Sequence, residues 1–540
     1  MVILFKWLVM VEYEVRHGTP DDLVYAEASI LEQAEPQHIS WGKASPYVSE
    51  LTPQEKKRLS VSLTKAYESL NRQKRKIDIP IMSNHFTRLN YNRLRSFLSS
   101  GHERVLRVPL SHNLHPYFYP PDGNIFVAND RGAKWLEMVV AKDRIKKAIF
   151  QEEDHKLTMV KKEGRWFIHA DEITAIKSLK LPKRKPLAGY PFFKGINYYP
   201  QKAPWQKFWR EFPLATIKRD FAILKRLKVN SLRIFLPFAQ FHSSEKVVYT
   251  ERLKTFLDLC RKAGFHTVVT FWDSIDYAYG NWPFYLGQLD SISMILKDYR
   301  DIVSIDLKNE ADLDFPLRGR EKVMGLLRAG LFNLAKTAPE IPVTIGWSTG
   351  DQAHLLAAYL DYVSFHDYAE PKGFSGRVAN LAKKVGPKPI LLSEFGLPSW
   401  NSFLWPHGHS QEEQAYYYSK ILNGKLPKQF MGHMAWTLYD FPEVPGWVAN
   451  SYLPWKVESQ KEMGLYIDPN EPKLAAKVFH DPASFRNQKL SWWKVWFKPF
   501  RVTLMVVGVF GLYLLIHRRR VYLRDQMVNR DIYEKHKDLK

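Results

Sequence analysis

Cysteine is almost missing from this chain of 540 residues: Cys260 is the only one, so no intrachain disulfide can form. It falls in a segment with helical periodicity, Arg252–Ala263, where a lone thiol is typically a small apolar core residue. The sequence also lacks the cysteine and histidine spacings typical of metal sites. It carries no helix-turn-helix, zinc-finger or RNA-binding signature. We therefore expect no metal, no cofactor and no nucleic-acid partner.

Negative charge is in short supply, because 79 lysine and arginine residues face 56 aspartate and glutamate residues, giving a net charge of +23. A surplus of this size favours nucleic acid, anionic lipid or an acidic polymer as a partner. Without a nucleic-acid signature, lipid and polymer are left. The hydrophobic fraction of 45% is ordinary for a globular protein, and the length favours two domains with appendages.

Only one long apolar run is present, Val502–Ile516, and it is shorter than the roughly 20 residues of a typical spanning helix. The residues on either side make a longer membrane helix plausible from sequence. Aromatic residues precede the apolar run, as in the interfacial belt of a membrane helix, and Arg518–Arg520 follow it. The pattern predicts a transmembrane helix over 496–517 and a basic cytoplasmic tail over 518–540, with the bulk of the chain outside the cytoplasm. The alternative is a buried helix or one that lies on a surface.

Residues 1–51 contain a short apolar start, Met1–Val11, with one lysine and no small-residue cleavage site after it. It fits the remainder of a truncated signal or anchor, and equally a buried first strand.

Residues 52–175 predict a small α+β domain. A helical pattern over Pro53–Lys76 precedes several strand-like runs that end in a hairpin, Lys156–His169. This hairpin resembles the last two strands of cone-shaped folds of the nuclear transport factor 2 type. A basic, proline-bearing linker over 176–191 follows.

The hydrophobic pattern of the sequence changes over 192–485, where apolar β-branched runs recur between amphipathic helices. Eight such runs predict eight strands: Phe193–Tyr198, Ser231–Leu236, His266–Phe271, Val303–Leu307, Ile341–Gly346, Tyr362–Phe365, Pro389–Leu392 and Met434–Leu438. Strands that alternate with helices indicate a parallel α/β fold, and eight repeats favour a (β/α)8 TIM barrel. No glycine-rich phosphate loop follows the first strand, which disfavours a nucleotide-binding sheet.

In such a barrel the active site lies at the C-terminal ends of the strands. The fourth and seventh predicted strands each end on a glutamate, Glu310 and Glu394. Two carboxylates that converge from separate strands are the arrangement that glycoside hydrolysis needs. The other strand ends carry aromatic, amide and charged groups: Tyr198, Tyr199, Arg233, Trp272, Asp273, Asn309, Trp347, His366, Tyr368 and Trp436.

This ordered set resembles the clan A glycoside hydrolases, nearest to the cellulase-like family five, over residues 190–480. It consists of Asn309-Glu310, Glu394 in Ser-Glu-Phe-Gly, His366-Asp-Tyr368, Arg233 in Leu-Arg-Ile-Phe, and Trp436 in Ala-Trp-Thr.

The resemblance implies that Glu310 is the general acid/base and Glu394 the nucleophile of a retaining enzyme, about 5 Å apart. It further implies that Arg233 and Tyr368 keep Glu394 ionised and that His366 supports Glu310. Asn309 would bind the sugar 2-hydroxyl, and Trp436 would form the floor of the cleavage subsite.

Strand three departs from the family pattern, because Phe271-Trp272-Asp273 stands where a histidine is common. Trp272 is a candidate stacking platform and Asp273 a candidate hydroxyl acceptor; a structural role fits each as well.

These observations predict a membrane-anchored extracytoplasmic glycosidase acting on β-linked saccharide or polysaccharide at the cell surface. Two alternatives remain. One is a transglycosylase on the same barrel. The other is a non-catalytic carbohydrate-binding component of a polysaccharide export system.

Overall fold

The computed structural model describes residues 39–71, 84–88, 90, 104–141, 144–242, 245–273, 282–403, 408–445, 448, 454–487, 489–493 and 497–537. The apolar start Met1–Val11 lies outside these residues. The chain divides into two compact units: residues 1–395 with 425–438, and residues 396–424 with 439–540. The domain boundaries drawn from the sequence remain predictions.

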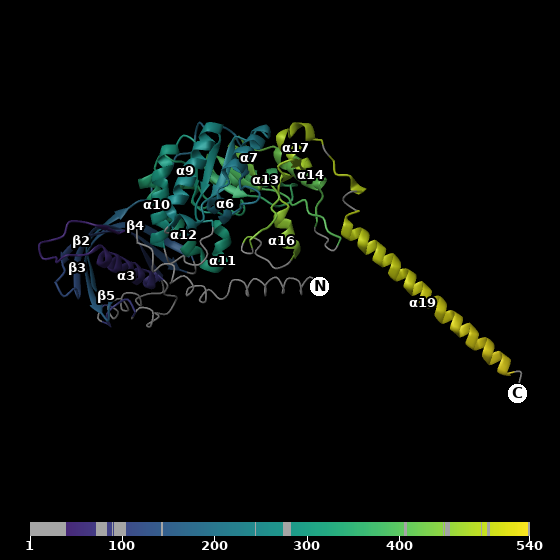
Figure 1. Cartoon of the computed structure of the whole chain (residues 1–540), viewed down its shortest axis with the longest axis horizontal. Helices are drawn as coiled ribbons and strands as arrows, with labels where there is room; N and C mark the ends of the chain where they lie inside the picture. Colours follow the sequence, from purple (N-terminus) through teal and green to yellow (C-terminus); the bar gives the residue numbers. More distant parts are fainter. Residues whose placement is uncertain are drawn as a thin grey trace. The chain divides into compact units, whose positions relative to one another are not determined.

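The first unit begins with a five-stranded sheet, called the N-terminal sheet here, in the order β1-β2-β3-β4-β5 (Figure 1). Helix α3 (Pro53–Asn71) contacts β2 and β5, which confirms the predicted α+β fold. The strands are β1 (Ile39–Trp41), β2 (Arg104–Phe118), β3 (Ile125–Ala141), β4 (Arg144–Lys162) and β5 (Arg165–Leu179).

Strands β3 and β4 are longer than the sequence runs indicated. Polar interruptions divide each of them into two apolar runs, but the backbone continues through irregular pairing between Asp130 and Ala133 and between Asp154 and His155. Gly132 lies in the left-handed region, φ +64°, within the first irregularity. A bulge accommodates an extra residue without ending a strand, so two predicted strands become one bent strand.

Helix α3 packs on this sheet through an apolar stripe at helical spacing. Leu59, Leu63 and Ala66 are buried in one core with Phe126 and Trp135. The opposite face carries lysine and arginine, which keep that side in water.

An ionic network is buried within the same sheet. His155 joins Glu153 (Nε2 to Oε2, 2.8 Å) to Asp171 (Nδ1 to Oδ1, 2.7 Å), and Arg107 pairs with Glu153 at 2.5 Å. The Tyr67 hydroxyl donates to Asp171 at 2.8 Å. Buried charges need partners of this kind, because desolvation is otherwise costly.

The rest of the first unit is built on a parallel sheet in the order β10-β9-β8-β7-β6-β14-β13-β12-β11. Strands β10 and β11 flank Ile345 within one short segment, 343–347, so the sheet closes on itself as eight strands. The structure thus confirms the predicted (β/α)8 barrel. The strands are β6 (Phe193–Asn197), β7 (Ser231–Phe235), β8 (His266–Thr270), β9 (Val303–Asp306), β10 (Val343–Thr344), β11 (Gly346–Trp347), β12 (Val363–His366), β13 (Ile390–Phe395) and β14 (Phe430–Ala435).

Helices cover the outside of these strands (Figure 1). They are α6 (Gln206–Glu211), α7 (Leu214–Arg226), α8 (Phe238–His242), α9 (Lys246–Ala263), α10 (Trp282–Leu296), α11 (Phe315–Arg318), α12 (Arg320–Thr337) and α13 (Phe374–Val385). Short 3-10 turns, η2 (Lys297–Tyr299), η3 (Ala311–Asp314) and η4 (Ala357–Tyr359), supplement them. Cys260 is buried in α9, as the sequence predicted.

The second unit contains α14 (Gln411–Leu422), α16 (Pro454–Lys461), α17 (Leu474–His480), η5 (Ala483–Phe485), α19 (Pro499–Lys537) and the two-stranded pair β15 (Tyr466–Asp468) and β16 (Glu471–Pro472). Helix α14 has the predicted bounds. It begins there because Ser410 and Glu413 form a capping box, which satisfies the exposed amides of the first turn.

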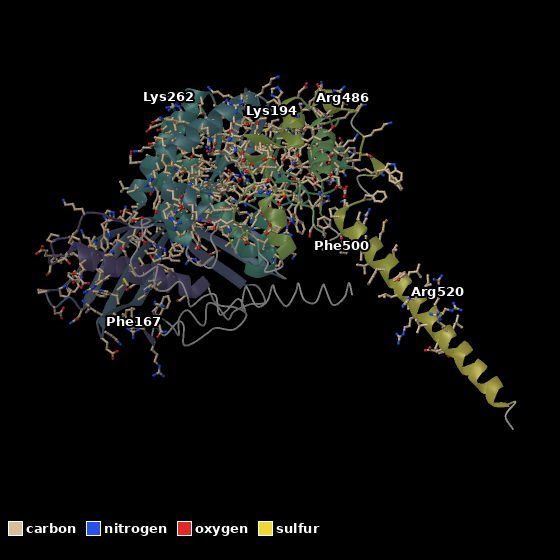
Figure 2. All side chains as sticks on the ribbon, turned by 45° about the vertical axis from the view of Figure 1, so that its right-hand side comes forward. Phe167, Lys194, Lys262, Arg486, Phe500 and Arg520 are labelled. Carbon is tan, nitrogen blue, oxygen red and sulfur yellow. The ribbon has the colours of Figure 1, made fainter. Side chains whose placement is uncertain are left out.

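Helix α19 contains one stretch, Pro499–Gln526, that is long and apolar enough to cross a membrane, and none of it is buried. Figure 2 shows Phe500 near its start and Arg520 further along it. The predicted tail continues the same helix to Lys537.

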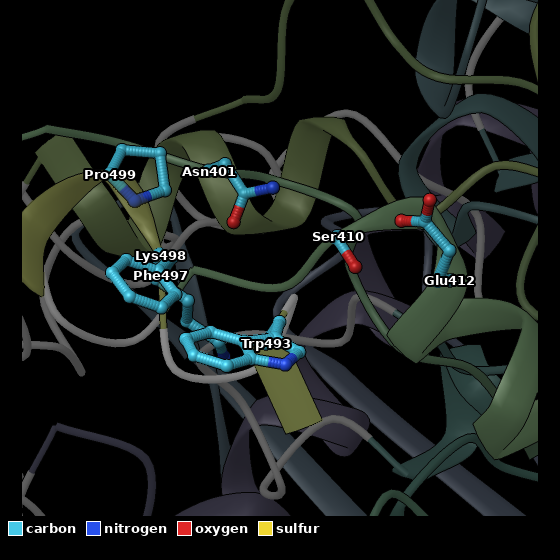
Figure 3. Close-up of a pocket in the computed structure, with 7 residues that line it drawn as sticks. All are labelled: Asn401, Ser410, Glu412, Trp493, Phe497, Lys498 and Pro499. Atoms are coloured by element: carbon cyan, nitrogen blue, oxygen red, sulfur yellow. The ribbon is translucent and has the colours of Figure 1, made fainter. Parts of the chain in front are cut away.

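A pocket of about 400 Å³ lies at the foot of α19 and is lined by Asn401, Ser410, Glu412, Trp493, Phe497, Lys498 and Pro499 (Figure 3). The Trp493 and Phe497 rings stack at 5.3 Å and are 63% and 49% exposed. The Lys498 ammonium donates to Glu413 (2.8 Å) and to the Gly408 carbonyl (2.7 Å). These bonds fix the chain that leads into α19 against α14. Exposed rings next to an apolar helix are typical of a membrane interface.

The buried network of the N-terminal sheet makes stability depend on pH. Burial by itself would lower the pKa of His155, but hydrogen bonds to Asp171 and Glu153 outweigh it and raise the pKa to about 9. Burial would raise the pKa values of Asp171 and Glu153, but bonds to His155 lower them. The His155 contribution is complete below its ordinary pKa of 6.5 and is lost as the pH rises to 9. The two carboxylate contributions are lost in acid, as the pH falls through their lowered pKa values.

We therefore expect the full chain to lose up to about 3 kcal/mol of unfolding free energy between pH 6.5 and 9 through His155. His155→Gln should lose less over this interval, because the titrating group is gone. Thermal unfolding at both pH values measures the difference. His354→Gln, an exposed histidine, is the control. An equal loss in wild type and His155→Gln would contradict the prediction.

Candidate active site

The ends of the barrel strands bring most of the predicted site residues together. Arg233 lies in β7, His366 ends β12 and Glu394 lies in β13. Asn309 and Glu310 follow β9 after two intervening residues, Leu307 and Lys308. Parallel strands present their C-terminal ends on one rim, so residues far apart in sequence meet there.

Arg233 is the centre of this cluster, and its side chain has no exposed surface. The guanidinium Nη1 donates to Glu394 and to Asn197 Oδ1 (3.0 Å). Its Nε and Nη2 donate to Asp306 Oδ2 at 3.0 and 2.6 Å, and Nη2 also donates to Asn309 Oδ1 at 2.8 Å. Burial by itself would lower the pKa of Arg233, but the carboxylates of Asp306 and Glu394 raise it. Arg233 is thus a fixed cation that bonds to groups at the ends of three other strands, β6, β9 and β13.

Asp306 is a site residue that the sequence analysis missed, because it lies inside the apolar run of strand four. It is fully buried, and its Oδ1 accepts from the Gly346 amide at 2.7 Å. A Cβ on Gly346 would stand 3.0 Å from Asp306 Oδ2 and 3.1 Å from Arg233 Nη2. Glycine at this position lets the backbone approach the ion pair. The sequence signal that could have identified Asp306 was an acidic residue inside an otherwise apolar strand.

The two predicted catalytic glutamates are close to one another. One oxygen of Glu310, one oxygen of Glu394 and a ring nitrogen of His366 lie within 4.8 Å of one another. His366 Nδ1 is 3.0 Å from Glu310 Oε1 and 3.4 Å from Glu394 Oε2. A retaining glycosidase keeps its two carboxyl groups about 5 to 5.5 Å apart, so this spacing matches that geometry.

His366 and the two glutamates shift one another's pKa. Burial by itself would lower the pKa of His366, but the two glutamates raise it above its ordinary value. Burial would raise the pKa of Glu310, but the hydrogen bond to His366 and its charge lower it. Both directions favour a proton on His366 over one on Glu310.

Tyr368, Asn309 and Asp273 complete the polar side of the site. The Tyr368 hydroxyl, whose residue is 40% exposed, donates to Glu394 Oε2 at 2.8 Å. The Asn309 amide donates to Asp273 Oδ1 at 2.9 Å. Burial raises the pKa of Asp273 to about 6, against the lowering effect of Arg233. Asp273 is therefore a third acid at this rim.

The two predicted tryptophans differ in position. Trp436 is partly exposed beside Tyr199 and Phe235, with ring centroids 6.3 and 6.0 Å away. Trp272 has no exposed surface, and its ring reaches the place where a side chain on Gly330 would stand. Of the two roles expected for Trp272, full burial favours the structural one over a stacking platform.

Lys308 is a second residue that the sequence analysis did not single out. It is 3% exposed, donates to the Trp272 carbonyl at 3.2 Å and pairs with Asp314 at 2.8 Å. These bonds tie the chain before Asn309 and Glu310 to the end of β8. Its signal was a lysine between a buried strand and the Asn309-Glu310 pair.

Glu310, His366 and Glu394 also have the donor types of a metal site. The Arg233 cation already bonds to Glu394. Its positive charge opposes a second cation at this point.

No protein-family model and no curated protein matches the chain. Solved structures do match. The exo-beta-1,4-mannosidase Op5Man5 from Opitutaceae bacterium strain TAV5 is 18% identical with a TM-score of 0.44, over 56% of this chain and 61% of that chain. A GH5_18 protein from Streptomyces cattleya in complex with GlcNAc is 17% identical with a TM-score of 0.45, over 57% and 82%. Bacteroides uniformis beta-glucuronidase 2 is 14% identical with a TM-score of 0.41, over 68% and 49%.

The assignment of the barrel rests on the strand pairing.

The Arg233 cluster predicts the effect of removing Asp306. Asp306→Asn leaves a buried guanidinium with one carboxylate fewer, so we expect a loss of about 3 kcal/mol of unfolding free energy. Guanidinium chloride unfolding measures it. The control is Asp298→Asn, an exposed aspartate of the same unit. A loss for Asp306→Asn no larger than that of the control would show that the ion pair does not stabilise the barrel.

Proposed function

We propose that this chain is a retaining glycoside hydrolase that cleaves β-linked saccharide or polysaccharide by double displacement. The observation that carries the proposal is the spacing of Glu310 and Glu394, whose oxygens lie within 4.8 Å of each other beside His366. Arg233 and Tyr368 bond to Glu394, whereas His366 bonds to Glu310. The two carboxyl groups therefore have different surroundings. Different surroundings suit different roles.

In the first step Glu394 acts as the nucleophile. Its carboxylate oxygen forms a bond to the anomeric carbon while the glycosidic carbon–oxygen bond breaks, and Glu310 gives its proton to the leaving oxygen. In the second step Glu310 takes a proton from water, whose oxygen attacks the same carbon and releases Glu394. The Arg233 and Tyr368 bonds hold the Glu394 oxygens in place through both steps.

His366 supplies the proton of the first step. A bound sugar excludes water from Glu310, and desolvation raises the pKa of a carboxyl group. The proton then passes from His366 Nδ1 to Glu310 Oε1 across the 3.0 Å hydrogen bond. His366 is therefore the positioning residue and proton reservoir for Glu310.

The remaining polar groups bind the sugar. Asn309 is held by Arg233 and Asp273, which orients it toward a 2-hydroxyl. Asp273 accepts from a further hydroxyl, and the exposed part of Trp436 forms an apolar floor.

The apolar stretch of α19 anchors the chain in a membrane. Arg518–Arg520 follow it, and clustered arginines stay on the cytoplasmic side. The barrel then lies outside the cytoplasm, where its substrate is polysaccharide at the cell surface.

Replacing the glutamates tests the chemistry. We expect Glu310→Gln and Glu394→Gln each to lower the release of reducing sugar by at least about 100-fold, since acid/base catalysis contributes roughly that much or more. The assay uses a panel of β-glucans, mannans, xylans and exopolysaccharide. NMR of the first product should show a retained β-anomer.

Glu340→Gln, an exposed glutamate far along the sequence from either strand end, is the matched control and should keep full activity. Full hydrolysis by Glu394→Gln would sink the mechanism. Redistributed chain lengths without new reducing ends would identify a transglycosylase, and binding without any turnover would identify a carbohydrate-binding component.

Truncation tests the anchor. Deleting residues 499–540 should move the chain from the membrane fraction to the soluble fraction, because the only apolar span among the described residues is removed. Deleting 527–540 alone is the control and should leave the chain in the membrane. Protease added to intact cells should degrade the barrel and spare a tag at the C-terminus. A membrane-bound 499–540 deletion would contradict the anchor, and a protected barrel would contradict the orientation.

A further inference from the structure

The loop after β9 carries Glu310, and little backbone pairing joins this loop to the next strand of the barrel. Parallel pairing between β9 and β10 ends at Asp306 and Thr344. One bond follows, in which the Gly346 amide donates to the Lys308 carbonyl at 3.1 Å. Among the described residues no later backbone bond joins the two segments, and β11 pairs with β12 instead. Side chains must therefore hold the loop to the barrel.

Asp312 supplies the strongest of these side-chain contacts. It lies in η3, two residues after Glu310, and both of its carboxylate oxygens accept from Ser348, the residue after β11. The Ser348 amide donates to Oδ1 at 2.8 Å and the Ser348 hydroxyl donates to Oδ2 at 2.7 Å. Two bonds from a carboxylate to one residue fix orientation as well as distance. We call this pair the Asp312–Ser348 clamp.

Two further contacts hold the same loop. The Lys308 ammonium, before Glu310, donates to the Trp272 carbonyl at the end of β8 at 3.2 Å. After Glu310, the Phe315 ring lies against the Trp347 ring at 6.3 Å between centroids. The loop is thus held on both sides of Glu310, and the clamp is the polar contact on its C-terminal side.

Glu310 depends on its backbone for its position. Its side chain is 29% exposed, and among the described residues its carboxylate bonds to His366 alone, at 3.0 Å. Its backbone lies in the left-handed region, φ +44° and ψ +49°. A residue with a side chain keeps this conformation only where the surrounding structure holds it there.

We propose that Asp312 is a positioning residue for the acid/base Glu310 and that it acts through its two bonds to Ser348. The proposal rests on the proposed function, which gives Glu310 the acid/base role. A displacement of about 1 Å in a reacting group can cost roughly 100-fold in rate. Loss of the clamp therefore slows the step in which Glu310 protonates the leaving oxygen.

The kinetic test compares leaving groups in the full chain in detergent. The probes are β-cellobiosides and β-mannobiosides that carry either a methyl or a dinitrophenyl leaving group. Dinitrophenolate leaves without a proton, so its departure does not need Glu310. We expect Asp312→Ala to lower kcat/KM by about 100-fold for the methyl glycosides and by less than about threefold for the dinitrophenyl glycosides. Asp298→Ala, at an exposed aspartate, is the control and should change neither.

Two conservative variants separate the bonds from the charge. In Asp312→Asn the amide oxygen can accept from the Ser348 amide and its NH2 group can donate to the Ser348 hydroxyl, so both contacts survive without the charge. We expect this variant to recover at least about tenfold of the loss in Asp312→Ala. Ser348→Ala removes one of the two bonds and should lower kcat/KM for the methyl glycosides by about tenfold. Thermal unfolding shows that each variant still folds.

A second measurement does not depend on turnover. The two glutamates raise the pKa of His366, so a displaced Glu310 should lower it. NMR titration of isotope-labelled histidine follows this group, and its signal is identified by its loss in His366→Gln. In Asp312→Ala the pKa of His366 should fall towards its value in Glu310→Gln, and in Asp312→Asn it should stay near that of wild type.

Three results would overturn the role of Asp312: equal losses for both leaving groups in Asp312→Ala and Ser348→Ala, no recovery in Asp312→Asn, or an unchanged pKa of His366 in Asp312→Ala. A wild-type chain that cleaves no probe, with His366 titrating as expected, would refute the hydrolase and leave the clamp in place. Failure of the proposed function and failure of the clamp are therefore distinguished.

Discussion

The barrel depends on a buried positive charge. Arg233 has no contact with water, so its charge is tolerable only because carboxylates and amide oxygens surround it. Those partners come from β6, β9, the segment after β9, and β13. One guanidinium therefore fixes the spacing of strand ends that no local interaction could hold together.

The same constraint sets the chemistry. A planar guanidinium can bond to Asp306 and Glu394 at once, so structural support and the proposed nucleophile share one cation. Glu310 instead bonds to His366. Its backbone lies in the left-handed region at φ +44°, as does that of Trp272 at φ +50°. Side chains adopt this region at a cost of about 1 kcal/mol or more, which the surrounding bonds must offset.

The sequence predicted the barrel and its paired glutamates because both leave local signals. Buried parallel strands read as short β-branched runs, and Glu310 and Glu394 end two of them. Asp306 gave a weaker signal, since one carboxylate in an apolar run looks like part of a strand and its partner is 73 residues away. For Trp272 both a stacking and a structural role stayed open, because the sequence shows that an aromatic residue follows a strand and not which way its ring turns. In the N-terminal sheet, β3 continues through a bulge at polar residues that the sequence pattern had indicated as a loop.

Two kinds of positive charge in this chain do different work. Arg233 is buried, so its field acts at short range on groups that cannot move away, and it is fully neutralised by them. Exposed cations such as Arg131 carry little desolvation cost. Such charges contribute little to folding, and their field extends over roughly a Debye length, about 8 Å in physiological salt.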